Sequence, residues 1–449
     1  MGRLFGTDGI RGVANTELSV QLCVKIGRAA AMVLSEATGG MPRVLIGADT
    51  RISGDMLVCA MTAGLLSVGA CVTNAGVLPT PAVAYLVKNN AYDAGVMVSA
   101  SHNPCEYNGI KIFNAQGYKL PDEVEDRIEE LILDDTFVFP QIIGGAVGSA
   151  FSDMSAVDDY AKHLLVCARG HFTGKTFAFD CANGAASATA QKVFPFLGAQ
   201  CLFLSKEPDG TNINRNCGST HMEQLQEYVL SHGCDAGFAF DGDADRLLAV
   251  DERGRLVDGD RIMAILARHM KEKGTLQKNT LVTTVMSNMG LFEFLKKYDI
   301  RSEKTKVGDR YVLENMLANS YNLGGEQSGH IIFSDFSTTG DGQLSAILLL
   351  NCLWESGASL AELSDDIEIF PQEMINVRVS AYGKLRLGED EEIKTAIEKA
   401  QAELGESGRV LVRASGTEPL VRVMMEGRDG GQIRHLCEEV AEVVRERLI

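Results

Sequence analysis

The sequence predicts an α/β protein of several domains that ends in a smaller α+β domain. Short apolar runs of strand length alternate with longer helical patterns over most of the chain, which is typical of α/β units with parallel sheets. A chain of 449 residues is too long for one hydrophobic core, so we expect three or four domains of roughly 100 to 150 residues each. Such a chain can form clefts between its domains.

The first third of the chain shows this alternation most clearly. Three helical patterns each precede a strand-length apolar run, and these pairs are residues 19–35 with 44–48, 56–68 with 71–74, and 82–88 with 94–98. The alternation restarts near Lys175 and reaches an apolar run at 235–240. It restarts again near Asp260, with a strand expected at 280–285.

After Pro371 the pattern changes. Residues 376–380 alternate as an antiparallel strand does, and a charged helical pattern covers 391–403. Two further strand patterns, RVLVRA and LVRVMMEG, precede a last helix. With turn-rich stretches at 144–153 and 251–260, these changes predict four domains, at residues 1–153, 154–255, 256–369 and 370–449.

Charge and cysteine usage limit the possible partners. The formal charge of −18 repels nucleic acid and anionic membranes, so a small anionic substrate would need a local basic pocket. The eleven cysteines are scattered without a C-x-x-C pair, which is typical of a reducing compartment. The N-terminus lacks a signal-peptide pattern and no run of 18 apolar residues occurs, so we expect a cytoplasmic protein.

The strongest local signal is the acidic motif DGDADR. Asp241, Asp243 and Asp245 follow an apolar strand, where α/β folds place their ligands. Three carboxylates at this spacing can converge on a hard cation. An EF-hand is excluded because Arg246 stands where that loop needs glycine and because strand patterns flank the motif. The alternative, a solvated acidic turn, must tolerate repulsion between the carboxylates.

A second motif, SASHNP, places Ser101 and His102 at the end of a buried strand. A serine at a strand end resembles a nucleophile, but no G-x-S-x-G elbow is present. Taken alone, Ser101 is better explained as a turn residue whose hydroxyl bonds to the local backbone.

Two more motifs carry groups suited to a sugar and a phosphate. GGEQSGH offers Glu326 and Ser328 to hydroxyl groups, although a polar hairpin with a structural His330 explains it as well. In RASGTEPLVRV, Arg413 and Arg422 flank a Ser-Gly-Thr loop that can form an anion nest. The alternative there is an edge hairpin with surface arginines.

Three shorter stretches are also suggestive. FGTDGIRG places Arg11 in a glycine-rich turn, and GADTRISG places Arg51 just after a strand. KVGDRYV contains Asp309, which is also explained as a helix N-cap. Structural turns account for the two arginines equally well.

Together and in this order, the motifs resemble the α-D-phosphohexomutase family over the whole chain. Within that family, DCANGA, NCGSTH and the glutamine of GEQSGH are similar to the bacterial phosphoglucosamine mutases. The resemblance implies a four-domain, heart-shaped fold, with three α/β domains of mixed sheets and a smaller C-terminal α+β domain. One motif from each domain would face a central cleft.

The resemblance also implies a role for each motif residue. Ser101 would be the phosphoserine, and it would hold one Mg²⁺ per subunit together with Asp241, Asp243 and Asp245. The remaining residues divide into a reacting end, formed by Arg11, His102, Lys111, Arg246 and His330; sugar contacts, Glu326 and Ser328; and a distal phosphate site, Arg413, Ser415, Gly416, Thr417 and Arg422. Either Lys111 or His330 would be the general base, with Lys111 favoured if neighbouring cations lower its pKa.

The implied reaction interconverts glucosamine 6-phosphate and glucosamine 1-phosphate through a phosphoserine and a sugar bisphosphate, which also serves as activator. A phosphoglucomutase or phosphomannomutase with the same mechanism is the nearest alternative, followed by a metal-dependent phosphatase and a non-catalytic sugar-phosphate sensor. The expected partner is a small sugar phosphate, with no nucleic acid and no membrane, and a homodimer is the candidate assembly.

Overall fold

The computed structural model describes residues 4–6, 8–415 and 419–449. Its contacts divide the chain into two units. Unit 1 contains Met1–Met286 and Asp299–Asp366, and unit 2 contains Ser287–Tyr298 and Ile367–Ile449. Among the described residues, no helix is both long and apolar enough to cross a membrane.

The first sheet of unit 1 carries the predicted nucleophile motif. Its six strands are ordered β1 (Ile10–Val13), β5 (Tyr107–Asn114), β4 (Ala94–Val98), β2 (Arg43–Ala48), β3 (Cys71–Val77) and β6 (Ala150–Ser152). The four strands from β4 to β6 are parallel, whereas β5 is antiparallel to both of its neighbours. The accompanying helices are α1 (Val20–Thr38), α2 (Ser53–Ser67), α3 (Thr80–Asn89) and α4 (Asp122–Leu133). The three predicted helix–strand pairs are confirmed.

Alternate side chains of β2 point to opposite faces of this sheet. Val44 and Ile46 belong to the core that includes α1 and α2, whereas a Cβ on Gly47 would lie 2.6 Å from Val83 of α3. Helices therefore cover both faces, which explains the unbroken apolar run of β2. The predicted boundary stretch 144–153 contains the edge strand β6, which pairs with β3.

The second sheet carries the acidic motif. Its five strands are ordered β11 (Leu256–Val257), β10 (Leu247–Asp251), β9 (Ala236–Phe240), β7 (Thr176–Asp180) and β8 (Gln200–Leu204). The helices are α5 (Ala156–Cys167), α6 (Ala186–Val193) and α7 (Glu223–His232). Phe179 stacks on Phe194 and on Phe238, with ring centroids 4.0 and 5.3 Å apart. This aromatic core anchors β9, whose last residue immediately precedes Asp241.

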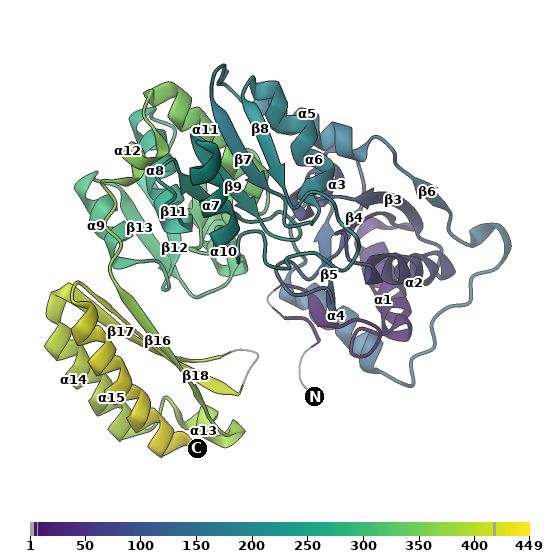
Figure 1. Cartoon of the computed structure of the whole chain (residues 1–449). Helices are drawn as coiled ribbons and strands as arrows, with labels where there is room; N and C mark the ends of the chain where they lie inside the picture. The colour runs from purple at the N-terminus through teal and green to yellow at the C-terminus, as the bar shows by residue number, and fades with distance from the viewer. Residues whose placement is uncertain (1–3, 7, 416–418) are drawn as a thin grey trace. The chain divides into compact units, whose positions relative to one another are not determined.

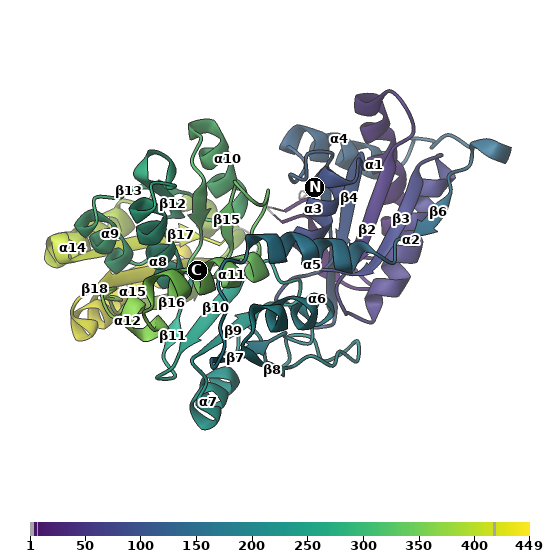
Figure 2. The ribbon, with the colours of Figure 1, turned by 90° about the horizontal axis from the view of Figure 1, so that it is seen from above.

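The third sheet carries the GGEQSGH hairpin. Its order is β13 (Arg301–Thr305), β12 (Thr280–Thr284), β14 (Leu323–Gly325) and β15 (Ile331–Phe333). The helices are α8 (Gly259–Glu272), α10 (Asp309–Asn319), α11 (Gly342–Ser356) and α12 (Leu360–Ser364). α5 contacts both α3 and α11, so one helix connects elements associated with different sheets (Figure 2).

Unit 2 has the predicted α+β character. Strands β16 (Gln372–Arg378), β18 (Leu420–Gly427) and β17 (Gly408–Ala414) form an antiparallel sheet. Its helices are α9 (Met289–Lys297), α13 (Ala381–Arg386), α14 (Glu391–Leu404) and α15 (Gly430–Leu448). α14 and α15 lie along this sheet (Figure 1). The short 3₁₀ turns of the chain are η1 (Gly144–Ala146), η2 (Phe194–Leu197), η3 (Gln277–Asn279) and, within unit 2, η4 (Gly405–Ser407).

A buried carboxyl caps α11. Asp341 accepts hydrogen bonds from the Leu344 N–H at 2.9 Å and from the Tyr160 hydroxyl at 2.8 Å. Burial raises the pKa of Asp341 to about 6, although these hydrogen bonds oppose the shift. The folded protein therefore holds this proton more tightly than the unfolded chain does.

This raised pKa predicts a pH-dependent loss of stability. Between about pH 4 and pH 6 the unfolded chain releases the Asp341 proton first, so the free energy of unfolding falls as the pH rises, by up to about 3 kcal/mol. In Asp341→Asn this contribution is absent. We expect the stability difference between wild type and variant, measured by urea unfolding at several pH values, to shift toward the variant across this window. A constant difference would contradict the assignment.

Candidate active site

The acidic motif forms a buried triad in the loop between β9 and β10. One carboxylate oxygen from each of Asp241, Asp243 and Asp245 lies within 4.8 Å of the others, and the three residues are at most 6 % exposed. The Oδ1 atoms of Asp243 and Asp245 are buried without a hydrogen-bond partner in the described structure. Buried carboxylate oxygens of this kind suit a hard cation such as Mg²⁺.

The electrostatics of the triad also favour a cation. Burial, followed by repulsion from Asp245 and Asp243, raises the pKa of Asp241 well above its usual range. Lys111 offsets part of the charge, because its Nζ lies 2.9 Å from Asp243 Oδ2 and 3.4 Å from Asp245 Oδ2. One lysine cannot balance three carboxylates. The chemistry and geometry of the donor set therefore fit a divalent metal ion.

A threonine without any sequence signal holds the middle carboxylate. Thr80, at the start of α3, donates its hydroxyl to Asp243 Oδ2 at 2.5 Å and its N–H to the Asp243 carbonyl at 2.9 Å. Both residues are buried. This contact orients Asp243 and links the first and second sheets.

Ser101 points into the triad. It lies in the turn after β4, is 1 % exposed, and donates its hydroxyl to Asp241 Oδ2 at 2.6 Å. His102 Nδ1 lies 3.4 Å from the same hydroxyl oxygen. Burial, followed by repulsion from Arg246 and Arg11, lowers the pKa of His102 to about 4, so its imidazole is neutral near pH 7. The serine is a turn residue whose hydroxyl faces a candidate metal site.

Gly242 allows the serine turn to approach the acidic loop. A Cβ at this position would lie 2.4 Å from the Ser101 carbonyl oxygen and 2.8 Å from Asn214 Nδ2. Backbone atoms cannot move aside as a flexible side chain does. Glycine is therefore required at this contact.

The Gly242 contact predicts a destabilising effect of one methyl group. Gly242→Ala should lower the free energy of unfolding by about 2 kcal/mol, because overpacking forces the two loops apart. Gly145→Ala is the control, since no atom lies within 4 Å of a Cβ there. Urea unfolding of both variants checks the expectation, and equal stability would mean that the two loops are not in contact.

Lys111 is a buried cation in this structure. Burial by itself lowers its pKa, but attraction to Asp243, Asp8 and Asp245 outweighs burial and raises the pKa well above its usual value. A role for Lys111 as the base would require neighbouring cations to lower its pKa, and that requirement is not met. Attraction to three carboxylates outweighs the repulsion from Arg11.

His330 lies at the end of a chain of charged groups. Its Nε2 accepts the Gly340 N–H at 3.0 Å, and its Nδ1 lies 3.8 Å from Asp309 Oδ2. Asp309 also pairs with Lys119 at 2.5 Å, and Lys119 pairs with Asp8 at 2.5 Å. The backbone contact implies that Nε2 is unprotonated, so the neutral ring carries its proton on Nδ1, toward Asp309. The N-cap explanation of Asp309 is wrong, because Gly308 is the N-cap of α10 and Asp309 is its first residue.

Two arginines complete the charged environment of the triad. Arg11 forms an ion pair with Asp8, and Arg246 Nε lies 3.8 Å from Asp245 Oδ1. Burial opposes the charge on Arg246, but attraction to Asp241, Asp245 and Glu326 raises its pKa. The basic groups are therefore concentrated beside the triad despite the acidic whole-chain charge.

The GGEQSGH motif forms the turn between β14 and β15. Glu326 Oε1 accepts the Gly308 N–H at 3.1 Å, which ties this turn to the start of α10. Gln327 Nε2 donates to Asp258 Oδ2 at 3.3 Å. Ser328 is exposed at the tip of the turn. The motif is a polar hairpin that presents Glu326 near Arg246.

The last motif lies in unit 2. Arg413 on β17 and Arg422 on β18 are direct cross-strand partners, and the Ser415 N–H donates to the Leu420 carbonyl at 2.9 Å. Burial, followed by repulsion from Arg422, lowers the pKa of Arg413. Two adjacent guanidinium groups favour a bound anion. Gly416 and Thr417 lie outside the described residues.

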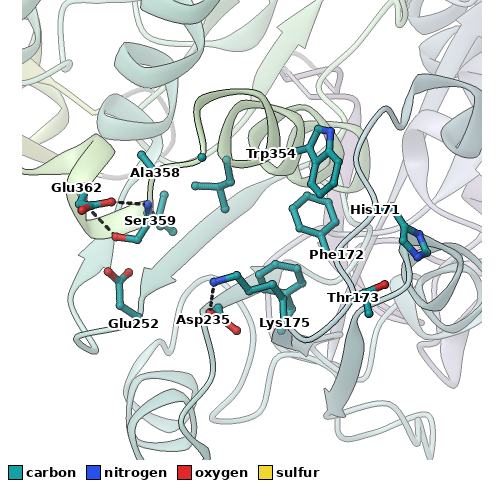
Figure 3. A pocket seen from close by; sticks show the side chains of 14 residues that line it. His171, Phe172, Thr173, Lys175, Asp235, Glu252, Trp354, Ala358, Ser359 and Glu362 are labelled. Carbon is teal, nitrogen blue, oxygen red and sulfur yellow. Dashed lines mark hydrogen bonds and ion pairs between the residues drawn. The ribbon is translucent and has the colours of Figure 1, made fainter.

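A separate pocket of about 500 Å³ shares no residue with this site. Phe172, Lys175 and Trp354 are among the residues that line it (Figure 3). Lys175 pairs with Asp235 at 2.8 Å, and Ser359 and Glu362 form a helix capping box. Lys175 is therefore paired with a carboxylate of the same pocket.

Four family models match the chain in order. Phosphoglucomutase/phosphomannomutase alpha/beta/alpha domain I matches residues 2–139, domain II matches 158–254, domain III matches 258–370, and the C-terminal domain matches 374–443. Together the matches cover most of the sequence.

Curated relatives match over their full length. Phosphoglucosamine mutases from Ruminiclostridium cellulolyticum and from a Thermoanaerobacter species are each 53% identical to the chain over 100% of both proteins. Among solved structures, a phosphoglucomutase/phosphomannomutase family protein from Burkholderia thailandensis matches with a TM-score of 0.83 at 23% identity, covering 99% of this chain and 98% of that one. An Aspergillus fumigatus N-acetylphosphoglucosamine mutase, in complex with GlcNAc-6P and magnesium, matches with a TM-score of 0.73 at 18% identity, covering 99% and 96%.

Proposed function

The chain belongs to the phosphoglucomutase/phosphomannomutase family, and from that premise we propose that it interconverts glucosamine 6-phosphate and glucosamine 1-phosphate. The relatives at 53% identity are named phosphoglucosamine mutase, which supports glucosamine as the sugar of the substrate. The observation that carries the mechanism is the 2.6 Å hydrogen bond from the Ser101 hydroxyl to Asp241, because it puts an alcohol beside a candidate metal site.

Ser101 is the proposed phosphoryl carrier. In the resting enzyme its oxygen holds a phosphoryl group, which it gives to a sugar hydroxyl to form a bisphosphate and a free serine. The serine then takes the other phosphoryl group, which releases the isomeric monophosphate. Asp241, Asp243 and Asp245 would hold Mg²⁺, which when bound supplies the positive charge that phosphoryl transfer requires.

The buried cations have distinct proposed roles in the transfer. Lys111, Arg11 and Arg246 neutralise the charge on the moving phosphoryl group, which suits their raised pKa values. His330 is the proposed base. Taking a proton requires its Nε2 to exchange the Gly340 N–H for a sugar hydroxyl, and Asp309 then stabilises the charged ring. His102, neutral and beside Ser101, lines the same end.

The remaining predicted residues bind the parts of the substrate that do not react. Glu326 and Ser328 contact sugar hydroxyls, and Arg413, Ser415, Gly416, Thr417 and Arg422 bind the distal phosphate. Adjacent arginines suit that role because a bound phosphate relieves their repulsion. The bisphosphate must reverse its orientation between the two transfers. Added sugar bisphosphate would therefore activate the enzyme by restoring phospho-Ser101.

The division into domains and the assembly of the protein are also proposals. We propose domain boundaries after residues 153, 255 and 369. The family models support the first two, which fall between matches, and the third lies one residue before the end of the domain III match. A homodimer is the proposed assembly, and size-exclusion chromatography with light scattering tests it.

A substrate panel tests the proposed function. Glucosamine, glucose and mannose phosphates are compared with Mg²⁺ and a trace of sugar bisphosphate. We expect kcat/KM to favour the amino sugar by about tenfold or more, which corresponds to about 1.4 kcal/mol of transition-state discrimination. Preference for a neutral hexose would support the phosphoglucomutase or phosphomannomutase alternative, and net release of phosphate would support a phosphatase.

A further inference from the structure

The peptide groups around Ser101 are held by two side chains, and we propose that Arg51 and Asn214 form a clamp that positions the Ser101 hydroxyl for phosphoryl transfer. Arg51 follows β2, and Asn214 lies in the loop between β8 and α7, so the clamp joins two sheets of unit 1. The inference rests on the proposed role of Ser101 as phosphoryl carrier.

Arg51 binds the serine turn through its backbone carbonyls. The arginine side chain is fully buried. Its Nη2 donates to the carbonyl oxygens of Ser101 and Asn103, both at 2.8 Å. Its Nη1 donates to the Tyr107 carbonyl at 3.1 Å and to the Pro104 carbonyl. One planar guanidinium therefore holds four carbonyl groups of the segment 101–107, which a lysine cannot do.

Arg51 also acts on the other side of Ser101 through two further residues. Its Nε donates to Asp49 Oδ2 at 2.9 Å, and the same oxygen accepts the Ser99 hydroxyl at 2.7 Å. Ser99 Oγ in turn accepts the Ser101 N–H at 2.9 Å. The peptide groups before and after the Ser101 side chain are thus both fixed by one hydrogen-bond network.

Asn214 approaches the same turn from the second sheet. Its Nδ2 donates to the Ser101 carbonyl at 2.9 Å and to the Asn103 carbonyl at 3.0 Å. Each of these oxygens therefore accepts one hydrogen bond from Arg51 and one from Asn214, which uses both of its lone pairs. Asn214 itself is buried and has a φ of +56°.

The clamp matters because of the backbone conformation of Ser101. Its φ is +52°, in the left-handed region that a non-glycine residue keeps only when its surroundings hold it there. In that conformation the hydroxyl reaches Asp241. A misplacement of about 1 Å can cost about 100-fold in rate. Arg51 and Asn214 contact the nucleophile's backbone, so they are positioning residues.

Asn214→Asp and Arg51→Lys test the clamp. Asn214→Asp replaces a donating amide with a carboxylate that repels the two carbonyls. Arg51→Lys removes the planar guanidinium but keeps a positive charge next to Asp49. In the full-length enzyme we expect kcat to fall by about 100-fold, with KM and the affinity for Mg²⁺ changed by less than about threefold. The amides of residues 101–103 should exchange hydrogen at least about tenfold faster.

Matched controls separate positioning from general damage. Asn216→Asp makes the same change at an exposed residue of the same loop that is also left-handed, with φ of +54°. Arg255→Lys makes the other change at an arginine that bonds to Asp251 and Asp365. Both controls should keep wild-type kcat and wild-type exchange at residues 101–103.

The outcomes are distinct. Wild-type kcat in Asn214→Asp, or a loss confined to KM or to Mg²⁺ affinity, would overturn the clamp. If Arg51→Lys fails to fold, Asn214→Asp decides alone. Ser101→Ala is measured in parallel: an active Ser101→Ala would overturn the proposed function itself, whereas an inactive Ser101→Ala with fully active clamp variants would overturn only this inference.

Discussion

Ser101→Ala is expected to lower mutase turnover by about 10⁴-fold or more, because it removes the only atom proposed to carry the phosphoryl group. The fold should survive, since the Ser101 hydroxyl makes one short hydrogen bond, to Asp241. Alanine keeps the backbone groups that Arg51 and Asn214 bind. Glucosamine 6-phosphate should therefore still bind, within about threefold of the wild-type affinity.

Three measurements check this expectation: turnover, isothermal titration with substrate, and mass spectrometry after incubation with sugar bisphosphate. The wild type should gain one phosphoryl group and the variant none. Ser99→Ala is an informative comparison, because it removes a hydroxyl that helps to position Ser101 but leaves the Ser101 hydroxyl in place. This variant should therefore still become phosphorylated on Ser101. Full turnover in Ser101→Ala would end the phosphoserine mechanism.

Asp241→Asn is expected to lower kcat/KM by about 10³-fold, because it removes a proposed metal ligand and its charge from the proposed site of transfer. The same substitution should not destabilise the metal-free protein. Burial and repulsion from Asp245 and Asp243 make the Asp241 charge unfavourable without metal, so neutralising it should leave the metal-free protein as stable as the wild type or more stable.

Thermal unfolding with EDTA measures the stability of the metal-free protein, and thermal unfolding with Mg²⁺ measures the stabilisation by the metal. Ligand binding stabilises a fold by about 2.7 kcal/mol when the ligand is present at 100 times its Kd, and the variant should lose most of that gain. Asp341→Asn, which changes a buried carboxyl outside the triad, should keep it. A Mg²⁺ response that is equal in wild type and Asp241→Asn would remove Asp241 from the metal site.

The parts of the site that could be predicted are those encoded by local spacing. Asp241, Asp243 and Asp245 follow a recognisable strand at fixed intervals, so their convergence needs only local geometry. Thr80 could not be found in this way, because it meets Asp243 across 163 residues and has no motif of its own. Lys119 and Asn214 were missed for the same reason, since their partners come from distant segments. Asp8 has a local partner in Arg11, but its ion pair with Lys119 spans 111 residues.

Prediction of the fold is limited in the same way, because only elements with a clear local pattern can be found. Long periodic elements such as α1 and β2 were predicted because their apolar pattern is complete within the segment. The edge strand β6 has three exposed residues, too few to show alternation, and lies in a stretch that was predicted to be turns. The first strand of the last sheet begins at Gln372, before the clear alternation at 376, because a partner strand can pair with residues whose own pattern is weak.

The left-handed backbone at Ser101 restricts which alcohol can occupy the position. Threonine offers the same hydroxyl chemistry, but a side chain branched at Cβ is strongly disfavoured at a φ of +52°. Glycine would suit the backbone and leave nothing to phosphorylate. Steric limits on the main chain, more than the reactivity of the oxygen, therefore select serine over threonine as the amino acid proposed to carry the phosphate.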